Sequence, residues 1–268
     1  MDRDYWHKQT ADTPLYPDML WSRPENRLFA GKLLIIGGNI HGFAASAEAY
    51  SAATAAGIGT ARMYLPDSLH KLLGKTFDAG EFGRATPSGS FSQLALAEAL
   101  AMGNWADGVQ LAGDLGRNSE TAIFLEKFAI KHPGQLTIAK DAADYYITTP
   151  DTLLARPDTL LVISMAQLQK LAMNAKYTTA FTFDMDILRF VDALHAFTEL
   201  HGVNIIVKHL DNIFAASAGQ VSSTRLTADL PIWRVRTAGH AATWWLQNPS
   251  NTHAALTTAV FDSLHVTE

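Results

Sequence analysis

Short runs of apolar residues alternate along the chain with longer segments that are rich in alanine and leucine. The first run, Leu33-Leu34-Ile35-Ile36, is typical of a strand buried on both faces of a sheet. Similar runs predict further strands over residues 60–65, 108–112, 136–139, 160–163 and 203–207. Short strands that alternate with longer helical segments indicate βαβ units around a mostly parallel sheet.

The segments between these runs have helical character. Residues 43–56 are mostly alanine, with Ser46, Glu48 and Ser51 on one side, which predicts a helix packed closely against a neighbour. Gly202 favours a helix end after residues 186–201, and Asn248-Pro249-Ser250 separates the last two predicted helices. Further helices are expected over residues 92–102, ending at Gly103-Asn104, and over 118–131, 241–246 and 252–264.

The composition fits one α/β domain. The chain has 268 residues, of which 48% are hydrophobic and 18% charged, and no linker-like segment divides it. We therefore expect a single domain over residues 1–268, with residues 1–30 as an N-terminal extension that packs on it.

Charge and cysteine content exclude several classes of function. The net charge is −5 and no cluster of Lys and Arg forms a basic stripe, so nucleic acid is not an expected partner. The absence of cysteine excludes disulfides and thiolate chemistry. No apolar run approaches the ~20 residues of a membrane helix, so we expect no membrane partner and a cytoplasmic location.

A glycine-rich turn, Gly37-Gly38-Asn39, lies between the first predicted strand and the alanine-rich helix. Backbone N–H groups of such a turn can bind an anion at a helix N-terminus, although a tight turn without a ligand has the same sequence. The spacing of a P-loop and that of a dinucleotide fingerprint are both missing here.

Two other turns are expected at the same edge of the sheet. One is Ala112-Gly113-Asp114-Leu115-Gly116-Arg117-Asn118, and the other is Lys208-His209. Ligands of open α/β sheets bind at the carboxyl ends of the strands, so Lys208 is a candidate phosphate contact, with a solvated lysine as the alternative.

The stretch from Gly37-Gly38-Asn39 through Ala44-Ala45-Ser46 and Ala56-Gly57-Ile58-Gly59 to Leu65-Pro66 resembles the N-terminal motif of one enzyme family. This is the ribokinase-like, carbohydrate-kinase-like family of ADP- or ATP-dependent NAD(P)H-hydrate dehydratases. The resemblance implies a ribokinase-like three-layer α/β/α domain with a mostly parallel central sheet.

Other segments extend the resemblance over nearly the whole chain. Leu115-Gly116 and Asp141-Ala142 match family motifs, although Ala112-Gly113-Asp114 replaces Gly-Pro-Gly. In Lys140-Asp141-Ala142-Ala143-Asp144, which resembles the family's Leu-Asp-Ala-Asp-Ala, an alanine stands at the position of the second acid. Lys208, Phe214 and Gly219-Gln220-Val221 are similar to the family's strand, lysine and hairpin. The resemblance implies ADP or ATP as nucleotide, a hydrated NAD(P)H as substrate and an accompanying Mg²⁺. It also implies a set of substrate- and nucleotide-binding residues, namely Gly38, Asn39, Ala45, Gly116, Asp141, Lys208 and Gly239.

The departures from the family fall at the expected catalytic positions. The family's Gly-Thr/Ser-Gly-Asp turn, which begins a helix, is similar to Thr237-Ala238-Gly239-His240 here, with His240 at the aspartate position. An imidazole at a helix start would be held in its neutral, basic form by the helix dipole, so His240 is the candidate catalytic group, with a polar helix-start residue without chemistry as the alternative. The family's Thr-Pro-His-Pro-Gly-Glu segment corresponds to Ile163-Ser164-Met165-Ala166-Gln167, without its His and Glu.

Three functions remain open from the sequence. The first is a family member that binds nucleotide but does not catalyse the reaction. The second is an active NAD(P)H-hydrate dehydratase, a lyase, and the third is a small-molecule kinase, whose chemistry also needs the missing aspartate. A homo-oligomer is expected, and Trp244-Trp245 is assigned either to packing of the C-terminal helix or to an oligomer contact. No metal-ligand spacing is present, so no built-in metal site is expected.

Overall fold

In the computed structural model, which describes residues 3–73, 79–227 and 233–265, every strand belongs to one ten-stranded sheet. The strand order is β1-β10-β9-β8-β7-β6-β5-β2-β3-β4. All neighbouring strands are parallel except β9, which is antiparallel to both β8 and β10. The strands are β1 (Trp6–Thr10), β2 (Lys32–Gly37), β3 (Thr60–Pro66), β4 (Gly80–Gly83), β5 (Gly108–Gly113), β6 (Gln135–Ala139), β7 (Thr159–Ile163), β8 (Asn204–His209), β9 (Asn212–Ser217) and β10 (Gln220–Arg225).

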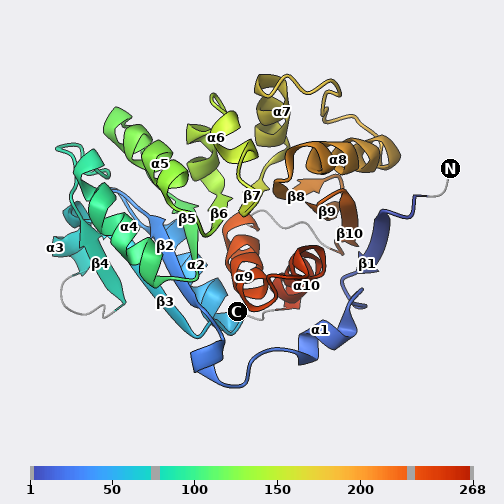
Figure 1. Cartoon of the computed structure of the whole chain (residues 1–268), viewed down its shortest axis with the longest axis horizontal. Coiled ribbons are helices and arrows are strands. Elements are labelled where there is room, and N and C mark those ends of the chain that lie inside the picture. The colour runs from blue at the N-terminus through green and yellow to red at the C-terminus, as the bar shows by residue number, and fades with distance from the viewer. Residues whose placement is uncertain (1–2, 74–78, 228–232, 266–268) are drawn as a thin grey trace.

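Helices cover both faces of the sheet (Figure 1). One face carries α2 (Ala44–Ala55), α9 (Arg234–Gln247) and α10 (Thr252–His265). The other face carries α4 (Leu96–Trp105), α5 (Ser119–Lys131), α7 (Met165–Asn174) and α8 (Ile187–His201). The expected three-layer arrangement with a mostly parallel central sheet is therefore confirmed.

Shorter elements complete the described chain. They are α1 (Pro17–Trp21), η1 (Arg27–Phe29), η2 (Asp67–Leu69), α3 (His70–Leu73), η4 (Gln93–Ala95), η5 (Lys140–Tyr145) and α6 (Asp151–Leu154). The N-terminal extension contributes α1, η1 and the edge strand β1, which pairs in parallel with β10.

The central strands are buried on both faces, as their continuous apolar runs predict. All six residues of β5 are buried. On β2, Leu34 and Ile36 pack towards α4 and α5, while Leu33 and Ile35 pack towards α2. This burial on both sides is the reason that strand periodicity is absent from the sequence there.

Some element boundaries differ from expectation. Helix α4 continues through Gly103 to Trp105, because Gly103 packs against His132 and Phe128, where a Cβ would meet His132 at 3.2 Å. Helix α9 begins at Arg234 rather than at residue 241. Gly202, with a φ of 64°, ends α8 as predicted, and Asp186 is the N-cap of this helix, which begins at Ile187.

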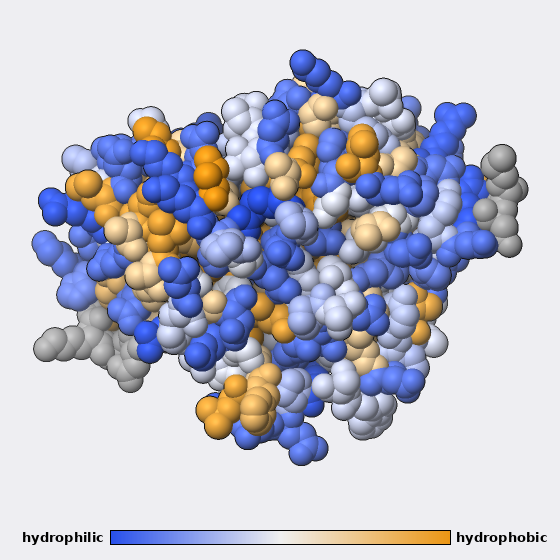
Figure 2. Space-filling model, viewed as in Figure 1, coloured by the Kyte–Doolittle hydropathy of each residue, from blue (hydrophilic) through white to orange (hydrophobic). Residues whose placement is uncertain are grey.

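The surface is mostly hydrophilic in the view of Figure 2, with an apolar area at its lower edge over η1. Leu28 and Phe29 of η1 are 86% and 78% exposed. Among the described residues, no helix combines the length and the apolar character that crossing a membrane requires.

Candidate functional site

The turns singled out from the sequence meet at one edge of the sheet, where the parallel strands end. The chain order reverses between β2 and β5, because β3 and β4 lie on one side of β2 and β5 lies on the other. This is the switch point at which open α/β sheets bind ligands. Gly38 and Asn39 follow β2 at this point, and Asp114 follows β5.

The turn after β2 is tied to the turn after β5. Gly38 has a φ of 90° and donates its N–H to the carbonyl oxygen of Gly113 at 3.0 Å. Asn39 donates from Nδ2 to the carbonyl oxygen of Asp114 and accepts the N–H of His41 at Oδ1, 2.8 Å away. Asn39 thus lies in the expected place and holds the two turns together.

Asp141 fixes the turn after β5. Its Oδ1 accepts the N–H of Asp114 at 2.8 Å, and its Oδ2 accepts the N–H of Leu115 at 3.1 Å. Both carboxylate oxygens are therefore used to shape the protein's own backbone. Asp114 itself has a φ of 56°, a conformation that costs energy for a residue other than glycine.

One cleft at this edge, the Tyr145 cleft, has a volume of about 570 Å³. Tyr145 donates its hydroxyl hydrogen to the carbonyl oxygen of Gly116 at 2.5 Å, and burial raises the pKa of this tyrosine. Gly116 has a φ of 73°, and a Cβ there would lie 2.7 Å from Ser90 Oγ. The lining residues are Asn39, Asp114, Gly116, Arg117, Asn118, Ser119, Asp141, Asp144 and Tyr145.

The second cleft, the Arg234 cleft, has a volume of about 310 Å³ and lies between the beginnings of α2 and α9. Its lining residues are Ala44, Ala45, Glu48, Lys140, Trp233, Arg234 and Val235. The N-cap residues of the two helices are Phe43 and Trp233, whose side chains carry no oxygen that could accept a first-turn N–H. Of the substrate- and nucleotide-binding residues that the resemblance implies, only Ala45 lines this cleft.

Gln167 connects the Arg234 cleft to the strands beside it. Its Oε1 accepts the N–H of Ser164 and the Nη1 hydrogen of Arg234, each at 3.0 Å. Its Nε2 donates to the carbonyl oxygen of Lys140 and to Oδ1 of Asp144, each at 2.8 Å. Every hydrogen-bonding group of this amide is therefore occupied.

The expectation that Thr237-Ala238-Gly239-His240 begins a helix is wrong. These residues lie within α9, whose first residues are Arg234, Val235 and Arg236. A helix begun at Arg234 buries Gly239 against α2, where a Cβ would meet Ala52 Cβ at 2.7 Å. Gly239 is thus a helix-packing residue and lies away from the edge where an anion could bind.

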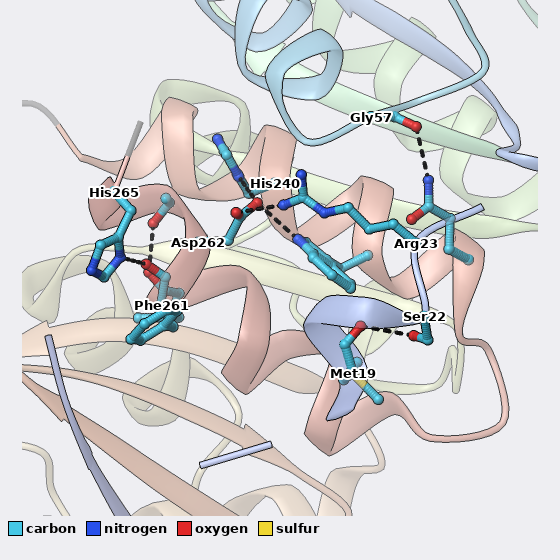
Figure 3. Close-up of polar contacts among 12 residues, drawn as sticks. Met19, Ser22, Arg23, Gly57, His240, Phe261, Asp262 and His265 are labelled. Carbon is cyan, nitrogen blue, oxygen red and sulfur yellow. Dashed lines mark hydrogen bonds and ion pairs between the residues drawn. The ribbon is translucent and has the colours of Figure 1, made fainter. Parts of the chain in front are cut away.

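His240 is fully buried between α9 and α10 (Figure 3), so its side chain cannot reach a substrate in this conformation. Its Nδ1 hydrogen-bonds Oδ2 of Asp262 at 2.7 Å, and Trp244 Nε1 donates to the same oxygen at 2.9 Å. Arg23 pairs with the other carboxylate oxygen of Asp262. The catalytic role inferred for His240 rested on an exposed helix start, which the structure contradicts.

The remaining predicted residues are more scattered. Lys208 is half-buried near the end of β8 and lines neither of the two clefts. Trp244 and Trp245 are 0% and 2% exposed, so they pack the core beneath α9 and α10 and offer no surface for an oligomer contact.

Asp114 and Asp141 do not fit as ligands of a protein-held Mg²⁺. Asp141 uses both oxygens on backbone N–H groups, and Asp114 is paired with Lys140 and with the N–H of Ala45. Among the residues that the structure describes, no group of three His, Asp or Glu side chains could hold a metal ion. Three basic side chains, Lys140, Arg234 and Arg117, line the two clefts.

Lys140, Arg234 and Gln167 were missed as site residues. Each of these residues occupies, or lies beside, a position where the sequence departs from the resembled motifs. A departure of this kind does not reveal its contact partner, because the partners come from segments that are distant along the chain.

No family model matches the chain, and no curated protein is similar to it in sequence. Solved structures do resemble it. A ribokinase-like superfamily protein from Enterococcus faecalis superposes with a TM-score of 0.71 at 14% identity, covering 98% of this chain and 88% of that one. A hypothetical protein from Streptococcus mutans gives a TM-score of 0.66 at 15% identity, covering 91% and 87%.

A third similar structure is the ADP/ATP-dependent NAD(P)H-hydrate dehydratase from Bacillus subtilis, co-crystallized with ATP and Mg²⁺. Its TM-score is 0.59 at 10% identity, over 92% of this chain and 86% of that one. Sequence identities this low support a shared fold but do not establish a shared activity. The chain therefore has the ribokinase-like fold, with its three layers and its mostly parallel central sheet.

Proposed function

We propose that this protein binds a small molecule of the nucleotide class through its phosphates at the Arg234 cleft, and that it does not catalyse NAD(P)H-hydrate dehydration. The observation that carries the proposal is the composition of that cleft. The first turns of α2 and α9 converge there, together with the side chains of Lys140 and Arg234.

This arrangement favours a negatively charged ligand. Each helix N-terminus presents backbone N–H groups and the positive end of the helix dipole. Lys140 and Arg234 add two positive charges, and the acid on this cleft, Glu48, is paired with Arg236 at 3.3 Å. Arg234 donates one hydrogen bond from Nη1 to Gln167, and a guanidinium has further N–H groups that can bind phosphate.

The loss of catalysis rests on the residues at the start of α9. General acid–base catalysis needs a titratable group within hydrogen-bond reach of the reacting proton. The helix begins with Trp233-Arg234-Val235-Arg236, which contains neither a carboxylate nor an imidazole. His240 lies in the core and is hydrogen-bonded to Asp262.

The alternative function is an active NAD(P)H-hydrate dehydratase, and one observation favours it. Asp144 is exposed on the Tyr145 cleft, and the Nε2 group of Gln167 donates a hydrogen bond to its Oδ1. Asp144 would then act as the acid–base group. A small-molecule kinase would need the same group as the base that accepts a hydroxyl proton.

Two measurements test these functions. Thermal unfolding is followed with ADP or ATP, with and without Mg²⁺. A ligand at 100 times its Kd should add about 2.7 kcal/mol to the unfolding free energy. Recovery of nicotinamide absorbance is then followed with hydrated NADH and either nucleotide. Stabilisation without recovery is the expected result, whereas recovery that Asp144→Asn abolishes would support the enzyme.

The expected homo-oligomer also remains a proposal, supported by the exposed Leu28 and Phe29 of η1. Light scattering of the purified protein gives the mass in solution. A monomer at micromolar concentration would contradict it.

A further inference from the structure

The two clefts adjoin at an ion pair. Asp114 lines the Tyr145 cleft and Lys140 lines the Arg234 cleft, and the Lys140 ammonium donates to Oδ1 of Asp114. The other carboxylate oxygen accepts the N–H of Ala45 at 2.7 Å. Ala45 and Lys140 both line the Arg234 cleft, so the Asp114 carboxylate occupies donors that face the proposed phosphate site.

The backbone holds both partners in position for this contact. Asp114 and Lys140 each have a φ of 56°, in the left-handed region that side chains other than glycine and asparagine rarely adopt. Asp141 fixes the turn of Asp114 through two N–H groups. Gly113 faces Asp141 Oδ1 so closely that a Cβ would lie 2.5 Å away. The turns therefore place the carboxylate of Asp114, which follows β5, against the ammonium of Lys140, which follows β6.

The pair can still be broken by a ligand. The side chains of Asp114 and Lys140 are 20% and 38% exposed, so solvent screens their attraction. A phosphate group carries more charge than a carboxylate and has three acceptor oxygens, and it therefore competes well for an ammonium and a backbone N–H.

We propose that Asp114 is an internal competitor for the anion site and that the phosphates of a pyrophosphate-bearing ligand displace it. The inference rests on the proposed function. Displacement frees the Lys140 ammonium and the Ala45 N–H for the ligand. Displacement also breaks the Asp114–Lys140 pair that lies between the two clefts, so that a ligand longer than a single phosphate can extend from the Arg234 cleft into the Tyr145 cleft.

The test compares wild-type protein with Asp114→Asn by titration calorimetry with inorganic pyrophosphate and with ADP. The amide is isosteric and keeps an oxygen for the Ala45 N–H, but it loses the charge that holds Lys140. Asp114→Gly is the second variant, because glycine accepts a positive φ without strain. The matched control is Asp12→Asn, since Asp12 is an exposed acid that follows β1 at the far edge of the sheet.

Both Asp114 variants should bind pyrophosphate and ADP about fivefold more tightly than wild type, which is the gain from removing one partly exposed ion pair. The melting temperature of Asp114→Asn without ligand should fall, because α2 loses a charged capping group. If Asp114 had only a structural role, its substitution would lower both the melting temperature and the affinity for pyrophosphate and ADP, and that result would overturn the inference.

The inference and the proposed function fail in different ways. If wild type binds pyrophosphate and the Asp114 variants bind it equally or more weakly, the competitor role is refuted while the phosphate site stands. If neither wild type nor any Asp114 variant binds pyrophosphate or ADP, both are refuted. Asp12→Asn should bind as wild type does.

Discussion

Arg234 donates its Nη1 hydrogen to Oε1 of Gln167 at 3.0 Å, and this contact joins the start of α9 to the start of α7. Gln167 lies in a segment that departs from the resembled family motifs. Asp114 and Lys140 also replace family residues and contact each other. Each of these two contacts therefore joins polar side chains from segments that are distant along the chain.

Gln167→Glu should destabilise the protein by about 1 to 3 kcal/mol, the cost of leaving polar groups unpaired. The Nε2 group of Gln167 donates to the carbonyl oxygen of Lys140 and to Asp144, and a carboxylate would present an oxygen to both. Urea unfolding at pH 7 measures the difference. Gln169 serves as the control, because Gln169→Glu changes the same groups on the same helix; equal losses in the two variants would contradict the role given to Gln167.

Gly239→Ala should lower the unfolding free energy by about 1 to 3 kcal/mol through overpacking of α2 against α9. The added Cβ would meet Ala52 Cβ at 2.7 Å and the carbonyl oxygen of Ala49 at 3.0 Å. Denaturant unfolding gives the loss, and calorimetry gives the Kd for pyrophosphate. A large increase in Kd with unchanged stability would instead place Gly239 in the anion site.

The stability should depend on pH through His253. Burial first, and then the nearby His7, lower the pKa of His253 to about 4 in the folded protein, from 6.5. The unfolded chain therefore binds more protons between these values, so the stabilising effect of neutral His253 is complete above pH 6.5 and is lost as the pH falls towards 4. We expect a loss of about 2 kcal/mol across this range, allowing for the partial exposure of the side chain.

Unfolding free energies of wild type and His253→Gln, measured from pH 7 to pH 4, check this expectation. The variant cannot titrate, so its curve should be flatter than that of wild type. Parallel curves would show that His253 does not control the acid side of the stability profile.

A second pH effect should come from Asp262. Burial would raise the pKa of this carboxyl, but hydrogen bonds from His240 and Trp244 and the charges of His240 and Arg23 hold it below 3.8. A lowered folded-state pKa means that the carboxylate stabilises the fold above the unfolded pKa, and this stability is lost as the pH falls through the folded pKa.

Asp262→Asn should therefore cost about 2 to 3 kcal/mol at pH 7, typical of hydrogen bonds to a charged group. The difference from wild type should shrink below pH 4. Denaturant unfolding at pH 7, 4 and 3 gives the comparison, and a difference that stays constant over this range would contradict the assignment.

The layers of the fold could be predicted because the strands and helices have strong local patterns. The alanine-rich helix and the apolar run at Leu33-Leu34-Ile35-Ile36 were both found where the structure has α2 and β2. The edge strands β1 and β4 were missed because their residues are polar or glycine-rich and they obtain their conformation from pairing with β10 and β3.

The candidate site was only partly predictable. Gly38, Asn39 and Gly116 lie at the sheet edge, as inferred from strand ends, and Asp141, which the resemblance implied, lies there too. The start of α9 was misplaced by two turns, because Thr237-Ala238-Gly239-His240 was aligned with a family motif of which it keeps only Gly239. Packing of Gly239 on Ala52 places this residue inside the helix. The Arg234–Gln167 and Asp114–Lys140 contacts join distant segments and leave no local pattern.

The most direct test of the phosphate site is the Kd for ADP of Arg234→Gln, measured by calorimetry beside wild type and Arg27→Gln. Arg27 is an exposed arginine of η1, just before the start of β2 and away from the carboxyl ends of the strands. Wild type and Arg27→Gln should bind ADP equally, and Arg234→Gln should bind it at least about tenfold more weakly, the loss of a charge-assisted hydrogen bond. Equal affinity for all three proteins, or no binding by wild type, would contradict the phosphate site at the Arg234 cleft.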